Sequence, residues 1–196
     1  MNLSIRWKVT LGALMAVALG LTVAGWLALQ SIERLELARL TETLEARTGL
    51  AAYSLQALLS QSPQDSLPRF QDRLQAAAHD LSRQALARVT VIAPDGRVLA
   101  DSATQDSEIA HLDNHGTRPE VVQALATGRG TDIRRSDTTK QQMCYLALPL
   151  AAPDGTLAGL VRLALPLTEL EARVRDLHYT LGIAFGVAFI VAVALS

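Results

Sequence analysis

The chain has 196 residues, of which 49% are hydrophobic, and its formal net charge at pH 7 is −1. A mean hydropathy of +0.21 is high for a purely soluble protein, and the excess apolarity lies near the two ends of the chain. The balanced charge, without a basic run that carries interleaved aromatic residues, excludes a nucleic-acid-binding protein. The single cysteine, Cys144, excludes an internal disulfide, and its apolar surroundings favour a buried small side chain over a redox-sensing thiol.

The first apolar segment, Val9 to Leu29, has 21 residues without a charge. At about 1.5 Å per residue it is long enough to cross a hydrocarbon core of about 30 Å. Arg6 and Lys8 precede it, so residues 1–8 are predicted to stay in the cytoplasm and the chain to leave the membrane outward. A cleaved signal peptide is the alternative, but its apolar run is usually only about 7–15 residues long and ends in an A-x-A-like site.

A second uncharged segment, residues 179–196, is a short second membrane helix by the same criterion. Residues 30–178 are then extracytoplasmic, held at both ends by the inner membrane of a bacterium. No charged stop follows this segment, so we expect the sequence to be the N-terminal part of a longer protein.

Between the two spans the sequence first predicts helices and then strands. Residues 31–59 have helical periodicity and continue the first span, and a second helix follows a break at residues 60–65, with Asp65 or Ser66 as its cap. A strand-rich core, residues 87–166, opens with a hairpin turned at Pro94-Asp95-Gly96. After a polar loop, residues 103–117, we expect a short helix at 118–125 and further strands at 131–136, 142–150 and 157–165. The fold class is α+β, with a five-stranded antiparallel sheet and long N-terminal helices.

Four segments of this core carry a resemblance: ARVTVIAPDGRVLADS (87–102), NHGTRPEV (114–121), RRSDT (134–138) and MCYLALPL (143–150). As a set they resemble the input domains of PhoR-like bacterial sensor histidine kinases, which carry an extracytoplasmic PAS-like domain of the single Cache (PDC) type. The resemblance implies a PAS-like strand order, a homodimer formed through the N-terminal helix, and a cytoplasmic kinase region that signals to a cognate response regulator. Kinase activity is implied only for a parent protein, because none of the catalytic modules lies in these residues.

The sequence predicts neither catalytic residues nor a cofactor. It has no acid–base pair, nucleophile motif or glycine-rich phosphate loop. His111 and His115 flank Asp113 at a spacing that suits a metal on a helix, but the surrounding residues are loop-like and further ligands are missing, so no metal site is predicted.

Donor side chains gather instead on the third strand and the turn after it. Arginine forks and hydroxyl groups suit carboxylate or phosphate ligands, and a solvated hairpin tip is the simpler interpretation of the same charges. Tyr145 on the next strand, and His115 and Arg118 at the start of the short helix, join the candidates. The candidate ligand-binding residues are Arg134, Arg135, Ser136, Thr138, Lys140, Tyr145, His115 and Arg118.

The order of segments favours a transmembrane signal receptor, the input half of a two-component sensor histidine kinase. A small molecule or protein outside the membrane would change the conformation of the domain, and the paired membrane helices would carry the change inward. The input domain of a chemotaxis transducer or a diguanylate cyclase would have the same parts. The alternative from another class is an extracytoplasmic protein-interaction module without a small-molecule pocket.

Overall fold

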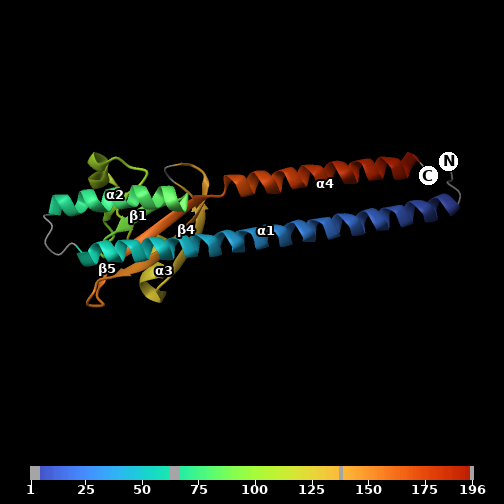
Figure 1. Cartoon of the computed structure of the whole chain (residues 1–196). Coiled ribbons are helices and arrows are strands. Elements are labelled where there is room, and N and C mark those ends of the chain that lie inside the picture. The colour runs from blue at the N-terminus through green and yellow to red at the C-terminus, as the bar shows by residue number, and fades with distance from the viewer. Residues whose placement is uncertain (1–4, 62–66, 137–138, 195–196) are drawn as a thin grey trace. The chain divides into compact units, whose positions relative to one another are not determined.

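A computed structural model describes residues 5–61, 67–136 and 139–194 of the chain. These residues divide into two compact units, residues 40–167 and the two helical segments 1–39 and 168–196 (Figure 1). The elements in chain order are α1 (Ile5–Gln61), α2 (Leu67–Ala85), β1 (Arg88–Ile92), β2 (Val98–Asp101), the 3-10 helix η1 (Asp106–His111), α3 (Pro119–Thr127), β3 (Gly130–Arg135), β4 (Gln142–Ala151), β5 (Leu157–Pro166) and α4 (Thr168–Ala194).

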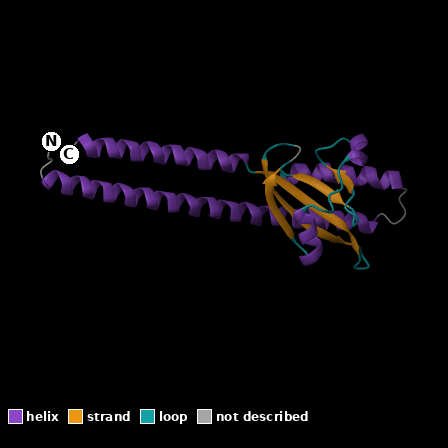
Figure 2. Ribbon diagram, turned by 180° about the vertical axis from the view of Figure 1, so that it is seen from behind, coloured by secondary structure: helices purple, strands orange, loops and turns teal. Residues whose placement is uncertain are grey.

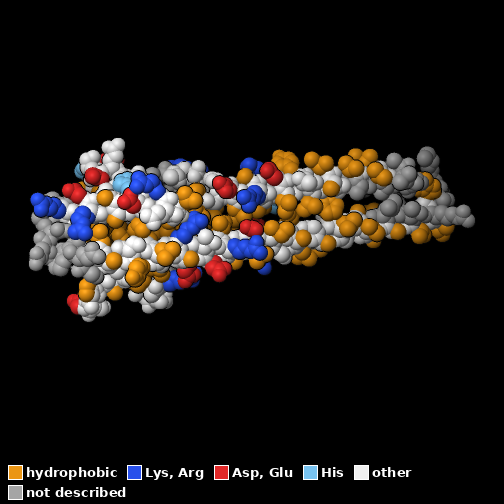
Figure 3. All heavy atoms as spheres, viewed as in Figure 1, with side chains coloured by type: hydrophobic (Ala, Val, Ile, Leu, Met, Phe, Trp, Pro, Cys, Tyr) orange, Lys and Arg blue, Asp and Glu red, His pale blue; other side chains and the backbone are white. Residues whose placement is uncertain are grey.

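Helix α1 joins the first apolar segment and the amphipathic segment after it into one uninterrupted helix, as the lack of proline predicts. It is the one helix, among the described residues, that is long and apolar enough to cross a membrane, over Met15–Leu59. Figure 3 shows apolar side chains along α1 and α4, and among the exposed ones are Met15, Val17, Leu19 and Leu21. The predicted cap of α2 at Asp65 or Ser66 lies outside the described residues.

The five strands form one antiparallel sheet in the order β2-β1-β5-β4-β3 (Figure 2). Strand β5 lies at its centre, where Thr90 pairs with Arg162 on one side and Ala147 pairs with Arg162 on the other. The hairpin β1-β2, the hairpin β4-β5 and the short helix α3 all lie where the sequence predicts them. The segment after β2 differs from the expected plain loop, because it forms η1 and buries Ile109.

The two faces of the sheet pack against different helices. Odd and even positions of a strand point to opposite faces, and on one face Ala147 and Leu160 pack with Val121 and Ala124 of α3. On the other face the Cys144 thiol is hydrogen-bonded to Thr41 of α1, and Leu146 and Leu163 are fully buried. Alternate residues of β5 counted from Leu160 therefore point to the face covered by α3, and Arg162 is one of them.

Candidate functional site

A small cavity lies on the α3 face of the sheet, beside the segment that leads into α3. Its volume is about 90 Å³. The residues around it come from β1, β3 and the residue after it, β4, β5 and the segment 112–118. They include four arginines and one aspartate: Arg88, Leu112, Asp113, His115, Arg118, Arg134, Ser136, Met143, Tyr145, Arg162 and Ala164. The cavity thus carries an excess of positive side chains.

One carboxylate, that of Glu120, is shared by two of these arginines. Arg134 Nη2 lies 3.0 Å and Arg162 Nη1 lies 3.3 Å from the same oxygen, Oε1. Glu120 stands in the first turn of α3 and is fully buried, and Arg162 is only 4% exposed. Burial lowers the pKa of Arg162 from its ordinary value, while the Glu120 carboxylate acts in the opposite direction. The buried Arg162 and the partly buried Arg134 therefore share one oxygen of a buried carboxylate.

A second buried carboxylate, that of Asp101, holds Arg88 at the end of β2. Arg88 Nε donates to both Asp101 oxygens, at 3.0 and 3.1 Å, and the Thr90 hydroxyl donates to Oδ2 at 2.8 Å. Gln75 of α2 makes two hydrogen bonds to the backbone of Asp101. Its Oε1 accepts from Asp101 N at 2.9 Å, and its Nε2 donates to Asp101 O at 3.0 Å. Helix α2 therefore holds the end of β2 in place, and with it Asp101, the ion-pair partner of Arg88.

The Tyr145 ring forms the aromatic wall of the cavity. The guanidinium carbon of Arg134 lies 4.1 Å from the ring centroid and that of Arg162 lies 5.3 Å away. At these distances the ring face stabilises a cation, so Tyr145 keeps both guanidinium groups on the α3 face of the sheet. Asp132 adds an ion pair to Arg134, with Oδ2 3.0 Å from Nε.

His115 is 8% exposed and sits beside these cations. Its pKa is lowered from 6.5 to about 3, mainly by burial and also by the positive charges of Arg162 and Arg118. The imidazole is therefore neutral at pH 7. Its Nδ1 is buried without a hydrogen-bond partner, as are Glu120 Oε2 and the Nε atom of Arg162. The protein leaves hydrogen-bonding capacity unused around this cavity, which is unusual for buried polar atoms.

Five of the predicted ligand-binding residues line the cavity, namely Arg134, Ser136, Tyr145, His115 and Arg118. The structure does not bring Arg135 and Lys140 there: both are exposed, and Arg135 Nε donates to the carbonyl of Lys140 at 2.8 Å. Arg135 alternates with Arg134 along β3, and this places its side chain away from the cavity. Thr138 lies outside the described residues.

The sequence interpretation missed Arg88, Arg162, Asp101 and Glu120. The strongest signal for them in the sequence is Arg162, a charged residue within the apolar run of β5. A charge in such a run indicates a buried ion pair, since a buried charge without one is costly. Within residues 5–61, 67–136 and 139–194 no cluster of three or more potential metal ligands occurs.

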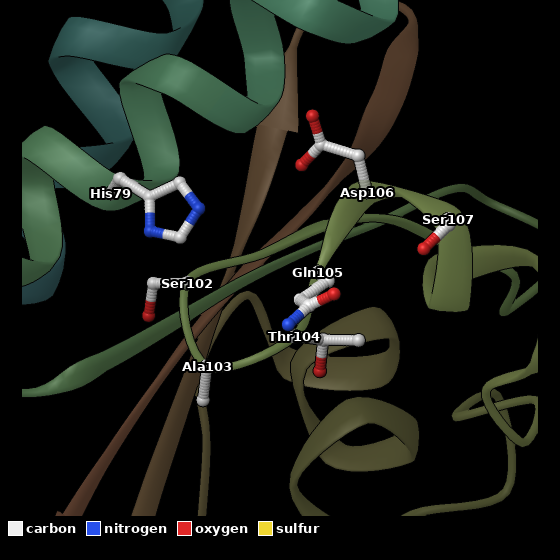
Figure 4. A pocket seen from close by; sticks show the side chains of 7 residues that line it. All are labelled: His79, Ser102, Ala103, Thr104, Gln105, Asp106 and Ser107. Carbon is white, nitrogen blue, oxygen red and sulfur yellow. The ribbon is translucent and has the colours of Figure 1, made fainter.

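A second, larger hollow lies between α2 and the segment after β2 (Figure 4). It has a volume of about 650 Å³ and is lined by His79 on one side and by residues 102–107 on the other. His79 Nε2 lies 3.1 Å from Gln75 Nε2, and the other lining side chains are short and polar or lie at the surface. This hollow is an open surface depression without a buried charge, so the arginine-lined cavity is the candidate site.

Solved structures match this fold at low sequence identity. The ligand-binding domain of the Campylobacter jejuni chemoreceptor Tlp3, in complex with L-valine, is 16% identical with a TM-score of 0.60, over 87% of this chain and 68% of that chain. The ligand-binding domain of Mlp24 with asparagine is 14% identical with a TM-score of 0.55, over 81% of this chain and 63% of that one. The chain has the PAS-like, Cache-type fold of these two ligand-binding domains.

An extracellular ligand binding receptor from Desulfohalobium retbaense DSM5692 also matches this chain, at 14% identity and a TM-score of 0.52. The match covers 71% of this chain, which spans a quarter of the length of that receptor. No protein-family model matches the chain, and no curated protein does. The Cache resemblance of the sequence is confirmed at the level of fold, and the narrower resemblance to PhoR-like kinases stays a prediction.

Proposed function

We propose that the sensor domain binds a small anion in the arginine-lined cavity and is the extracytoplasmic input domain of a transmembrane signalling protein. The observation that carries this proposal is the sharing of one buried carboxylate by Arg134 and Arg162 at the cavity wall. An anion placed there would offer both guanidinium groups further acceptor oxygens, since they now share a single oxygen of Glu120.

The chemistry of the cavity favours a carboxylate. Guanidinium forks bind carboxylates and phosphates in two-point geometry, and neutral His115 adds a nitrogen that carries no competing charge. A cavity of about 90 Å³ has room for about three waters, each taking about 30 Å³ in the liquid. A carboxylate with only a few carbon atoms fits that volume.

We place the domain outside the inner membrane of a bacterium. Residues 1–8 would be cytoplasmic, 9–29 would form the first span, 30–178 the sensor domain and 179–196 the second span. The long apolar run of α1, with exposed Met15, Val17 and Leu19, supports the first span, because such a surface is costly in water. A histidine kinase that works as a homodimer, with a response regulator as partner, is the output that the sequence resemblance favours.

Contacts between α1 and the sheet provide a route for the signal. Thr41 is hydrogen-bonded to the Cys144 thiol on β4, and Glu45 forms an ion pair with Arg129, which joins α3 to β3, at 2.9 Å. A ligand shifts the position of α1 only through different affinity for two states, and coupling of about 1–3 kcal/mol is typical.

Hydrogen exchange on the whole chain in detergent micelles tests the anion site. Acetate, succinate and sulfate are compared with neutral acetamide at equal ionic strength. An anion at a hundred times its dissociation constant stabilises the folded domain by about 2.7 kcal/mol, which slows exchange in β1, β4 and β5. Arg134→Gln should abolish the effect, and Arg135→Gln, on the exposed side of the same strand, should retain it.

Two results would contradict the proposal. Equal protection by acetamide and acetate would remove the role of charge, and equal loss in Arg134→Gln and Arg135→Gln would remove the role of the cavity. Specific retention of an envelope protein on the immobilised chain, with no anion effect, would instead favour a protein-docking module.

The orientation in the membrane is tested with single cysteines in a Cys144→Ala background. A membrane-impermeant maleimide should label Ala103→Cys in intact cells and leave Asn2→Cys unlabelled until the membrane is opened. Labelling in the reverse order would place the sensor domain in the cytoplasm and refute the topology.

A further inference from the structure

Glu120 uses guanidinium donors that an anionic ligand in the cavity would need. Its side chain is fully buried, and one oxygen, Oε1, accepts from Arg134 at 3.0 Å and from Arg162 at 3.3 Å. Both arginines line the cavity, whereas Glu120 itself approaches them from α3 behind it. The other carboxylate oxygen, Oε2, is buried and makes no hydrogen bond.

We propose that Glu120 is a built-in competitor, an internal carboxylate that neutralises Arg134 and Arg162 in the empty domain and is displaced when a ligand carboxylate binds. This inference rests on the anion site proposed above and adds its regulation. A ligand carboxylate offers two oxygens, one for each guanidinium group, whereas Glu120 uses only one. The exchange therefore improves the pairing of both arginines.

The displacement moves the side chain and leaves the first turn of α3 in place. The backbone carbonyl of Glu120 packs directly against Gly130 of β3, where a Cβ atom would overlap it, so the helix start has no freedom to shift toward the strand. Rotation about the Glu120 side-chain bonds is the remaining way to release the arginines. The α3 helix then loses its ionic tie to β3 and β5 while its backbone contact remains.

A competitor of this kind sets the threshold of the sensor. The apparent affinity for a ligand equals the intrinsic affinity multiplied by the fraction of domains in which the arginines are free. Removal of the Glu120 charge should therefore tighten anion binding, which is the opposite of the effect expected for a residue that helps to hold the ligand.

Acetate is the probe, because Glu120→Ala removes CH2–COO⁻, which is the acetate skeleton. Acetate is titrated against the whole chain in micelles, and binding is followed by hydrogen exchange of residues 88–166. We expect Glu120→Ala and Glu120→Gln to bind acetate about tenfold more tightly than the wild type, or more. Glu36→Gln, which removes a carboxylate from the exposed ion pair with Arg39 on α1, is the matched control and should leave the affinity unchanged.

Neutral acetamide distinguishes binding that depends on the negative charge from simple filling of a hole, because it has nearly the same shape as acetate. A mere hole in Glu120→Ala would take acetamide as readily as acetate, and that result would overturn the competitor. Where Glu120→Ala does not fold, Glu120→Asp, whose shorter side chain withdraws the carboxylate, provides a second variant with the same expected gain.

The remaining outcomes distinguish this inference from the anion site itself. Wild-type binding with equal or weaker binding in the Glu120 variants would refute the competitor and leave the anion site standing. No anion binding in the wild type, with acetate binding in the variants, would support the competitor and place its threshold beyond the concentrations tested. No binding by any of these proteins would refute both.

Discussion

The shared carboxylate predicts unequal costs for the two sides of the same ion pair. At 3.0–3.3 Å and an effective dielectric constant of about 20, each arginine gains roughly 5 kcal/mol of direct attraction to Glu120, before desolvation is subtracted. Glu120→Gln leaves the buried Arg162 without its carboxylate and Arg134 with Asp132 alone, and we expect it to lower the free energy of unfolding by about 3–5 kcal/mol. Arg162→Met leaves Arg134 paired with Glu120, so its cost should be only about 1–2 kcal/mol.

Native-state hydrogen exchange of β4 and β5 measures these costs on the whole chain in micelles. In the double variant only Arg134 remains, with Asp132 as its partner at 3.0 Å. The double variant should therefore be more stable than the sum of the single effects predicts, by about 2 kcal/mol or more. A larger cost for Arg162→Met than for Glu120→Gln, or strict additivity, would refute the picture of two cations that share one charge.

Two further predictions concern the surroundings of the cavity. His115 has a pKa of about 3 in the folded domain and about 6.5 when unfolded, so the unfolded state binds the extra proton and stability is lost as the pH falls from about 6.5 toward 3. With partial solvent screening the loss should be about 1 kcal/mol per pH unit, and His115→Asn should flatten it in denaturant titrations; an unchanged slope would contradict the buried neutral histidine. Gly130→Ala should destabilise the domain by about 2–3 kcal/mol because its Cβ overlaps the Glu120 carbonyl, whereas Gly49→Ala, in open space on α1, should stabilise it by about 0.5–1 kcal/mol; equal melting shifts would disprove the close contact.

The sheet could be predicted from the sequence because its signals are local. The two-residue period of β1, the Pro94-Asp95-Gly96 turn and the Gly128 that ends α3 each act within a few residues. The structure also contains η1, in which the Ile109 side chain is buried. The segment around it is otherwise polar, so its sequence predicts a plain loop.

The candidate site could be predicted only in part because its partners are far apart in the sequence. Arg162 meets Glu120, 42 residues earlier, and Thr90, 72 residues earlier. No local pattern gives those pairings, since they depend on the strand order β1-β5-β4 and on the docking of α3. The separation of Arg134 from Arg135 could have been predicted, because the alternation of β3 already puts neighbouring side chains on opposite faces.

Fluorine NMR of the whole chain labelled with 3-fluorotyrosine tests the anion site most directly. The chain has three tyrosines, of which Tyr53 and Tyr179 are 75% and 70% exposed, whereas Tyr145 is 5% exposed and lies under Arg134. Tyr145→Phe assigns the buried resonance. Titration with acetate or succinate should shift the Tyr145 signal to saturation and leave the other two in place. No shift at any concentration, or equal shifts of all three signals, would contradict an anion site at this cavity.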